Sequence, residues 1–232
     1  MISIGGSLLT RELTTENFRR YAKVVVDLWK AGHKVAVVCG GGQVCRDYRD
    51  VAKACDADWR LLDWIGVMAT HLNASTFAAV LASCGYPEVA RKVHWIQPTH
   101  ERTAVTEFKK YFGKRLVVGA GYEPGHSTDY DAAIFAAAVK ADLLVNASNI
   151  DGVYTADPKK DPAARKLPKL TYAGFLRILS QNEQSPGEYR LFDIGAAKAI
   201  KKAGIKTVFV DGRDPQEIMR AVKGGHNGTV VE

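Results

Sequence analysis

Short apolar runs alternate with longer amphipathic stretches along most of this chain. Lys34–Cys39 (KVAVVC) is continuously apolar after its first residue, which is typical of a strand buried on both faces of a parallel sheet. Between such runs, apolar residues recur at helical spacing, as at Phe18, Tyr21 and Val25. This alternation predicts a three-layer α/β sandwich, with helices on both faces of a mostly parallel central sheet. The expected strands are 2–4, 34–39, 92–97, 115–118, 143–147 and 207–210, with a last one ending at Val231.

The amphipathic stretches predict helices. Thr14 or Thr15 supplies a capping hydroxyl for the first helix, and Gly32 ends it. Asp58–Cys84 predicts a long helix with apolar residues on more than one face, which indicates burial against both the core and a second subunit. The stretch between the third and fourth strands is polar and only weakly helical. Further helices are expected at 128–139, from Thr171, at 194–203 and before the last strand, and a hairpin is expected at 149–158.

Three of the expected strands run into glycine-rich turns, which begin at Gly5, Gly40 and Gly119. Such a turn between a strand and a helix lets backbone N–H groups face a phosphate at the positive end of the helix dipole. A fourth strand opens Leu143–Pro158 (LLVNASNIDGVYTADP), which places Asn, Asp and Ser groups at the same edge. Because ligands bind at the carboxyl ends of the strands in an open α/β sheet, the chain predicts a site there for a ligand that carries phosphate.

Composition narrows the function classes. The chain has 232 residues and a net charge of +7, but its basic residues are scattered and form no block interleaved with aromatics, so nucleic-acid binding is disfavoured. Four cysteines in no C-x-x-C pair favour reduced thiols over a metal or disulfide frame. No unbroken apolar run approaches the roughly 18 residues of a membrane span, and no basic leader is seen. These features predict a single-domain cytoplasmic protein.

Several familiar catalytic signatures do not occur in the sequence. There is no G-x-x-x-x-G-K-[ST] run, which disfavours a P-loop enzyme, and the turn at Gly119 lacks G-x-G-x-x-G spacing, which disfavours a Rossmann dehydrogenase. Neither H-E-x-x-H nor G-x-S-x-G occurs, so the commonest hydrolase motifs are excluded as well.

The motifs that do occur lie along essentially the whole chain. They are I-G-G-S at Ile4–Ser7, G-G-G-x-x-x-R at Gly40–Arg46, D-x-x-G at Asp63–Gly66 followed by Asn73-Ala74, P-G-H-S-T-D at Pro124–Asp129, N-I-D-G-V-Y-T-A-D-P at Asn149–Pro158, G-E-Y-R-L-F-D at Gly187–Asp193 and H-N-G-T-V at His226–Val230. Together they resemble the amino acid kinase family, and within it the archaeal-type uridylate kinases. The resemblance implies transfer of the γ-phosphate of Mg-ATP to UMP, a step of pyrimidine nucleotide biosynthesis.

The resemblance also implies roles for individual residues. The expected ATP contacts are Gly6, Ser7, Gly42 and Arg46 at the phosphates, with Ser148, Asn149, Tyr154 and Asp157 around adenosine. The expected UMP contacts are Gly41, Asp63 and the run Gly121, Tyr122, Glu123, Pro124, Gly125, His126 and Ser127. Arg46 and Gly6 are the expected catalytic groups, with Lys198 as a second candidate cation. His126 is expected to be a hydrogen-bonding loop residue, since a phosphate acceptor needs no general base.

Elementary chemistry agrees with these roles. A carboxylate such as Asp63 can accept hydrogen bonds from both ribose hydroxyls, and Tyr154 offers a flat apolar surface to adenine. Without the resemblance, Asp63 could equally be a solvated helix carboxylate and Tyr154 a core aromatic.

The resemblance further predicts one domain over residues 1–232, with an acceptor-binding lobe at about 1–140 and an ATP-binding lobe at about 141–232. Mg²⁺ is expected to arrive with ATP, without a metal site made by the protein. The family implies a homo-oligomer, a hexamer built as a trimer of dimers.

Ser3 is where the chain departs from the wider family pattern, K-x-G-G-S, because a serine stands in the place of the lysine. Two alternatives therefore stay open. One is another small-molecule kinase of the same fold, acting on a carboxylate, carbamate or isopentenyl phosphate. The other is a non-catalytic protein that binds or stores anions.

Overall fold

The computed structural model of the chain describes residues 1–83, 87–158, 160–182 and 192–232. Cys84 and the stretch 187–191 of the G-E-Y-R-L-F-D motif lie outside the described residues.

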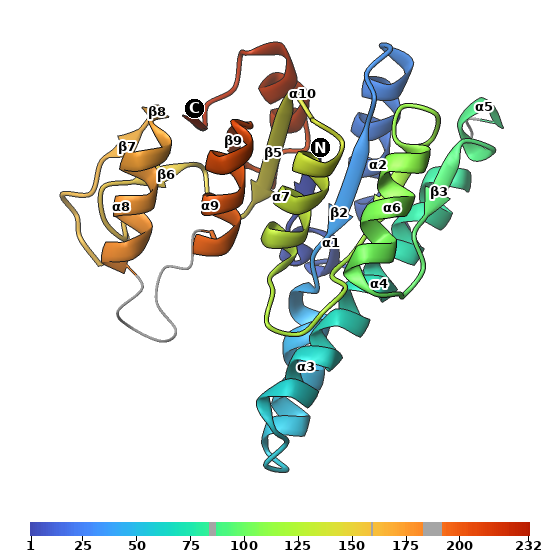
Figure 1. Ribbon diagram of the computed structural model, residues 1–232, viewed down its shortest axis with the longest axis horizontal. Helices are drawn as coiled ribbons and strands as arrows, with labels where there is room; N and C mark the ends of the chain where they lie inside the picture. The colour runs from blue at the N-terminus through green and yellow to red at the C-terminus, as the bar shows by residue number, and fades with distance from the viewer. Residues whose placement is uncertain (84–86, 159, 183–191) are drawn as a thin grey trace.

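A central sheet of eight strands runs through the molecule in the order β3-β4-β2-β1-β5-β9-β10-β8 (Figure 1). Neighbours from β3 to β9 pair in parallel, β10 is antiparallel to β9, and β8 is parallel to β10. The expectation of a mostly parallel sheet is therefore confirmed. The strands are β1 Ile2–Ile4, β2 Ala36–Cys39, β3 Val93–Trp95, β4 Leu116–Gly119, β5 Leu143–Ser148, β8 Lys169–Leu170, β9 Lys206–Asp211 and β10 Thr229–Val231; β6 Val153–Tyr154 and β7 Lys166–Leu167 form a separate pair.

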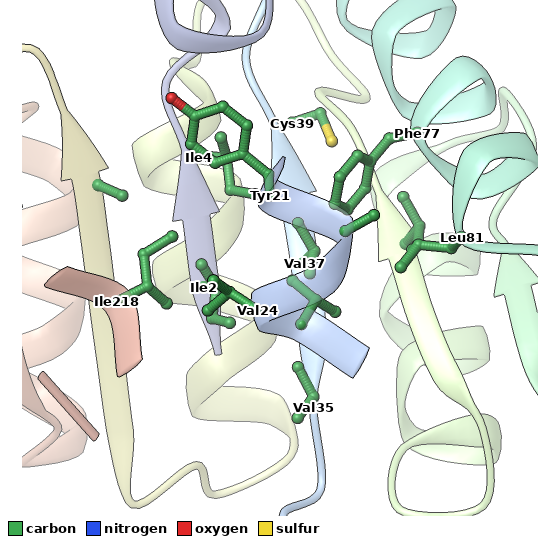
Figure 2. Close-up of a cluster of buried hydrophobic side chains, with 14 of the residues drawn as sticks. Ile2, Ile4, Tyr21, Val24, Val35, Val37, Cys39, Phe77, Leu81 and Ile218 are labelled. Carbon is green, nitrogen blue, oxygen red and sulfur yellow. The ribbon is translucent and has the colours of Figure 1, made fainter. Parts of the chain in front are cut away.

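Helices cover both faces of the sheet, which confirms the three-layer α/β sandwich (Figure 1). Side chains on alternate positions of each central strand enter two different cores. Figure 2 shows one of them, in which Ile2, Ile4 and Val37 of the sheet meet side chains from the helices on that face. The helices are α1 Gly6–Thr10, α2 Thr15–Lys30, α3 Gly42–Lys53, α4 Trp59–Ser83, α5 Pro87–Ala90, α6 Glu101–Tyr111, α7 Thr128–Ala138, α8 Tyr172–Asn182, α9 Ile194–Ala203 and α10 Gln216–Lys223.

The expected helix ends are confirmed by their hydrogen bonds. The Thr14 hydroxyl accepts a hydrogen bond from the Asn17 amide at 3.2 Å, so Thr14 is the N-cap of α2. Gly32 follows the end of α2 with a φ of +88°, a left-handed conformation that favours glycine. The Thr171 hydroxyl accepts from the Gly174 amide at 3.1 Å at the start of α8.

Two parts of the chain differ from expectation. The stretch between β3 and β4 forms a regular helix, α6, whose buried positions are only Ala104 and Phe108, so its apolar stripe is narrow. The expected hairpin at 149–158 is longer than predicted, because β6 pairs with β7, which begins at Lys166. Strands of two residues carry no readable alternation of polar and apolar positions, so the sequence pattern does not reveal β6, β7 or β8.

Helix α4 has two apolar sides, as expected. Its second half is buried in the core through residues such as Phe77 and Leu81, whereas a stripe along its first half is exposed to solvent. By length and composition α4 could cross a membrane, but 56% of its most apolar window is buried, and core helices of soluble proteins pass the same test. The exposed stripe consists of Leu61, Trp64, Met68 and Leu72, with Trp59 beside it and Tyr48 and Val51 on α3.

The turn after β1 and the turn after β2 pack backbone against backbone. A Cβ atom added to Gly6 would overlap the main chain of Gly40 and Gly42, and one added to Gly42 would overlap the Gly6 carbonyl. The side chains of Thr10 and Asn73 fasten this contact by hydrogen bonds. The Thr10 hydroxyl donates to the Gly6 carbonyl at 3.0 Å and accepts from the Gln43 amide at 2.9 Å.

Asn73 of α4 holds the second turn from the other side. Its amide nitrogen donates to the Gly40 carbonyl at 2.7 Å and to the Gly41 carbonyl at 3.0 Å, and its side chain is buried. These contacts leave room only for glycine, so the glycine run is required by packing.

Gly42→Ala should therefore destabilise the protein far more than Gly32→Ala. Both glycines have positive φ, but a Cβ on Gly32 meets nothing within 4 Å. Gly32→Ala should cost only the backbone strain, about 1–2 kcal/mol, while Gly42→Ala adds overlap with backbone that cannot move aside. Urea denaturation of the two variants measures the difference. Equal losses of stability would show that the two turns do not constrain each other.

Candidate active site

The carboxyl ends of β1, β2, β4 and β5 meet at one edge of the sheet. Because β1 lies between β2 and β5, the Gly5–Ser7 turn adjoins both the Gly40–Gly42 turn and the chain that follows β5. The Gly5 amide donates to the Ala147 carbonyl at 2.8 Å, and its α-carbon faces Ser148. Gly6, Ser7, Gly42 and Ser148, which were expected to contact ATP, are therefore close together.

Arg46 lies in the second turn of α3, directly after the glycine turn. Its side chain is exposed, and its Nε and Nη2 atoms donate to the Gln43 side-chain oxygen at 3.2 and 2.7 Å. A neutral amide partner leaves the guanidinium charge uncompensated by that contact. Arg46 is thus an exposed cation at the start of a helix whose first residue lies beside Gly6.

Asp63 of α4 meets the loop 121–127, although the two are far apart in the sequence. Its Oδ2 atom accepts from the Gly125 amide at 2.9 Å, and its Oδ1 atom lies 3.5 Å from Arg49 Nη2. Further along α4, the Thr70 hydroxyl accepts a hydrogen bond from the Gly121 amide at 2.9 Å. The expected UMP contacts Asp63 and 121–127 are therefore assembled into one wall.

Side chains of the loop 121–127 hold it against neighbouring elements by hydrogen bonds and ring stacking. The Tyr122 ring is buried, with its hydroxyl donating to the Ile96 carbonyl at 3.3 Å, so Tyr122 presents only its backbone to a ligand. The Glu123 carboxylate accepts from the Glu101 amide at the start of α6. His126 is exposed and stacks on Tyr130 with ring centres 4.2 Å apart. Pro124 is half-buried between them.

Ser127 joins two helix starts. It is the N-cap of α7, where its hydroxyl oxygen accepts from the Tyr130 amide, and it donates to Asp193 Oδ2 at 3.1 Å. Asp193 is in turn the N-cap of α9, with Oδ1 accepting from the Ala196 amide at 3.1 Å. The last residue of the loop 121–127 thereby links this loop to the start of α9.

The residues expected around adenosine follow β5. The Ser148 hydroxyl accepts from the Ile150 amide at 3.2 Å, and Asn149 is exposed beside it. The Tyr154 hydroxyl donates to both oxygens of Asp151, at 3.0 and 3.1 Å, and Lys166 pairs with the same carboxylate at 3.0 Å. Burial, and then the hydrogen bond to Asp151, raise the pKa of Tyr154.

Asp157 holds the end of this loop through its backbone. Its carbonyl oxygen accepts hydrogen bonds from the Lys160 and Asp161 amides at 3.0 and 2.9 Å. Lys198, the second candidate cation, is exposed on α9. Within the described ranges, no hydrogen bond or ion pair connects Lys198 to the other expected site residues, and its role as a cation of the site stays a prediction.

Three polar side chains meet between β1, β5 and α7. Ser3 Oγ donates to Asp129 Oδ1 at 3.2 Å, and Asn146 Nδ2 donates to the same oxygen at 2.6 Å. Asn146 was not expected in the site, although a lone amide within the apolar run LLVNAS is the kind of signal that indicates it. Thr10 and Thr70 were also missed, and a threonine within a helix gives no sequence signal.

Two titratable side chains are buried beneath the loop 121–127. Neither ring nitrogen of His71 and neither carboxylate oxygen of Asp131 has a hydrogen-bond partner among the described residues. Burial lowers the pKa of His71 to about 4. Burial, followed by the charges of Glu101 and Glu123, raises the pKa of Asp131 well above its usual value. His71 is therefore uncharged at neutral pH, and burial favours the neutral form of Asp131.

The part of the chain that the structure describes contains no cluster of three or more His, Cys, Asp or Glu side chains that could hold a metal ion. Mg²⁺ is commonly held by one or two carboxylates together with substrate phosphates. The oxygen groups of Asp129, Ser3 and Asn146 lie beside the glycine turns and suit such a hard cation. The residues present therefore fit a magnesium ion that arrives with a phosphate ligand.

Comparison with known proteins agrees with this arrangement. A uridylate kinase of Methanothermobacter thermautotrophicus is 38% identical over 231 residues, covering 100% of this chain and 98% of that protein. A crystal structure of uridylate kinase from Archaeoglobus fulgidus superimposes with a TM-score of 0.83 at 35% identity, covering 100% of this chain and 98% of that one. A UMP kinase structure from Bacillus anthracis, 23% identical with a TM-score of 0.79 over 100% and 94% of the two chains, shares the fold.

A model of the amino acid kinase family matches residues 1–211, which include both glycine turns, the loop 121–127 and all of β9. With its fold, its site and its full-length relatives in agreement, the chain belongs to the amino acid kinase family.

Proposed function

We propose that this protein is a UMP kinase, which transfers the γ-phosphate of ATP to UMP to give UDP and ADP. The observation that carries the proposal is the meeting of the two glycine turns, the Asp63 wall and the turn after β5 at one edge of the sheet. Its relatives named uridylate kinase are 35 to 38% identical over nearly the full chain, which supports the same activity. The product UDP places the reaction in pyrimidine nucleotide synthesis, which we assign to the cytoplasm.

The chemistry asks for positioning and charge neutralisation, because the acceptor is already a phosphate anion. We assign the backbone N–H groups of Gly6, Ser7 and Gly42 to the phosphates of ATP. Arg46 lies in the second turn of the helix that begins at Gly42, and its guanidinium can bind two phosphate oxygens at once. Mg²⁺, when bound with ATP, neutralises charge on the phosphates.

We assign UMP to an acceptor-binding lobe at about 1–140, and the adenosine of ATP to an ATP-binding lobe at about 141–232, while the phosphates of ATP lie against the glycine turns of the first lobe. Gly41 and Asp63 would hold the phosphate and ribose of UMP, and the loop 121–127 would enclose the uracil. A carboxylate has about four acceptor positions, so Asp63 can keep its bond from Gly125 and still accept from ribose. Ser148, Asn149, Tyr154 and Asp157 would surround adenosine.

We also propose a homo-oligomer, a hexamer built as a trimer of dimers. The exposed apolar stripe on α4 and its neighbours on α3 support it, since Val51 is 71%, Trp59 67% and Met68 58% exposed in the single chain. Contiguous exposed apolar side chains of this kind mark interaction surfaces. Sedimentation of a monomer at micromolar concentration would contradict the assembly.

The proposed activity is tested by a coupled assay of ADP release with purified protein, Mg-ATP and single acceptors. UMP should give the highest kcat/KM, above CMP, carbamate, isopentenyl phosphate and a control without acceptor. Preference for another acceptor would identify a different kinase of the same fold. No ADP release with any acceptor, together with binding of ATP or phosphate, would identify an anion-binding protein.

Arg46→Ala should lower kcat by about 100-fold or more while the fold is retained, which is the effect of removing one transition-state charge partner. The side chain is exposed and bonded only to Gln43 within the described residues, so the substitution removes little packing. Lys53→Ala, at the exposed end of the same helix, is the control and should leave kcat unchanged. Equal kcat values for the two variants would remove Arg46 from the mechanism.

Asp63→Asn should raise the KM for UMP about tenfold or more and leave the KM for ATP nearly unaltered. The neutral amide keeps an acceptor for Gly125 but loses charge-assisted bonds to ribose, worth roughly 1.5–3 kcal/mol. Steady-state kinetics with each substrate varied in turn measures both constants. Asp50→Asn, on the exposed face of α3, is the control. If both KM values move together, Asp63 supports the loop without contacting UMP.

Ser3→Lys should change kcat by less than tenfold. Ser3 is 2% exposed and 3.2 Å from Asp129, so an ammonium group introduced here would pair with that carboxylate before it reached a phosphate. Ser3→Met, similar in volume but uncharged, separates the effect of charge from that of size. A gain of tenfold or more in kcat for Ser3→Lys alone, about 1.4 kcal/mol of barrier, would mean that the native site lacks a cation and that Arg46 does not suffice.

A further inference from the structure

The motif H-N-G-T-V at His226–Val230 lies outside the contacts assigned above to ATP and UMP. It leads from α10 into β10, and its central residues make contacts in different directions. The Asn227 backbone amide donates to Glu217 Oε2 at 3.0 Å, and its side-chain amide donates to Oε1 at 3.2 Å. Gly228 lies so close to β9 that a Cβ atom added to it would overlap the Phe209 carbonyl. The start of β10 is thereby fixed against both α10 and β9.

Thr229 reaches from this strand to the separate β6–β7 pair. Its hydroxyl accepts a hydrogen bond from the Val153 amide of β6 at 2.8 Å and donates one to the Leu167 carbonyl of β7 at 2.6 Å. Thr229 and Val153 are both 0% exposed, so solvent does not reach the bond between them. One buried hydroxyl group therefore connects both strands of the pair to β10 of the central sheet (Figure 1).

Gly152 shows how closely β6 approaches this hydroxyl. It has a φ of +146°, and a Cβ atom added to it would lie 2.8 Å from the Thr229 hydroxyl oxygen. A side chain at this position would therefore push β6 away from β10. The glycine of the N-I-D-G-V-Y-T-A-D-P motif and the threonine of the H-N-G-T-V motif are thus two halves of one contact.

This contact bears on nucleotide binding because Tyr154 directly follows Val153. Tyr154 is one of the residues assigned above to adenosine, and it lies on a strand of only two residues. An isolated pair of strands is at best marginally stable in water, so the loop 149–158 depends on support from outside the pair. The inference rests on the proposed function, since it assumes that this loop holds the adenosine of ATP.

We propose that Thr229 is a positioning residue for the ATP-binding part of the site, which holds the loop 149–158 in place without touching the nucleotide. Without its hydroxyl, a buried N–H group and a C=O group lose their partner, and they regain hydrogen bonds only when β6 moves toward water. The loop then spends part of its time displaced, and the affinity for an adenine nucleotide falls by the fraction of the protein that stays competent to bind. The UMP contacts on α4 and the loop 121–127 should not respond.

Thr229→Val tests the proposal, because valine keeps the shape of the side chain and removes its hydroxyl. Calorimetric titration with Mg-ADP, and separately with UMP, should show at least fivefold weaker binding of ADP and less than a twofold change for UMP. Thr229→Ser keeps the hydroxyl and should bind ADP within twofold of the wild type. Hydrogen–deuterium exchange should be faster over residues 149–158 in Thr229→Val than in the wild type, which reports the position of the loop independently of turnover.

Thr207→Val is the matched control. Thr207 is also 0% exposed and lies on β9, next to β10, but its hydroxyl donates to the carbonyl of Ile205, two residues earlier in the chain. This variant loses a buried threonine hydroxyl from the same sheet and no hydrogen bond to the β6–β7 pair. It should therefore keep the wild-type affinity for both ADP and UMP.

Unchanged ADP affinity or unchanged loop exchange in Thr229→Val would overturn the proposal, as would equal losses for ADP and UMP. A loss of ADP affinity in Thr229→Ser or Thr207→Val as large as that in Thr229→Val would overturn it too, because the Thr229 hydroxyl would not be the cause. Should Thr229→Val fail to fold, Thr229→Cys replaces it, since a thiol is only a weak donor and acceptor; wild-type affinity for ADP in that variant would overturn the proposal. A wild-type protein that binds no ADP would instead overturn the proposed function, and with it this inference.

Discussion

The contact between the turns after β1 and β2 is the constraint on which the rest of the site depends. The main chain of Gly6 touches that of Gly40 and Gly42, with no side chain between them. Because the two turns cannot separate, the first residues of α1 and α3 are set side by side. Arg46 then emerges one turn along α3, close to the Gly5–Ser7 turn. The start of α3, and with it Arg46, is thus positioned by a contact between two stretches of backbone, which Thr10 and Asn73 fasten.

Neutral hydrogen bonds fix most of the parts that surround this contact. Thr10 and Asn73 fasten the glycine turns, and Thr70 holds Gly121. None of these groups changes charge near neutral pH, so the shape of the site should hold over a wide range of pH. The buried His71 is uncharged for the same reason, since burial keeps its pKa at about 4. The ionised groups, such as Arg46 and Asp63, are left at the surface, where ligands can reach them.

Sequence patterns predicted the main strands and helices, because these elements depend on local and repetitive features of the sequence. The short apolar run Lys34–Cys39 is typical of a buried strand, and Thr14 and Gly32 mark helix ends by their own conformational preferences. Contacts between distant segments could not be predicted in this way. Nothing in the residues near Asp63 shows that Gly125 donates to it, and the β6–β7 pair is too short for a pattern. The assigned ligand contacts remain predictions, because no ligand contact follows from the fold alone.

The register of β1 has a consequence for the order in which the chain can fold during synthesis. Ile2 pairs with Val37 on one side and with Val145 on the other. The strand at the centre of the sheet is therefore made first, yet it cannot gain its second neighbour until β5 leaves the ribosome. At about 5–20 residues per second, that delay is roughly 7–30 s. Throughout this interval one edge of β1 is open to pairing with other chains, so the nascent protein is most vulnerable to misassembly where the mature protein is best protected.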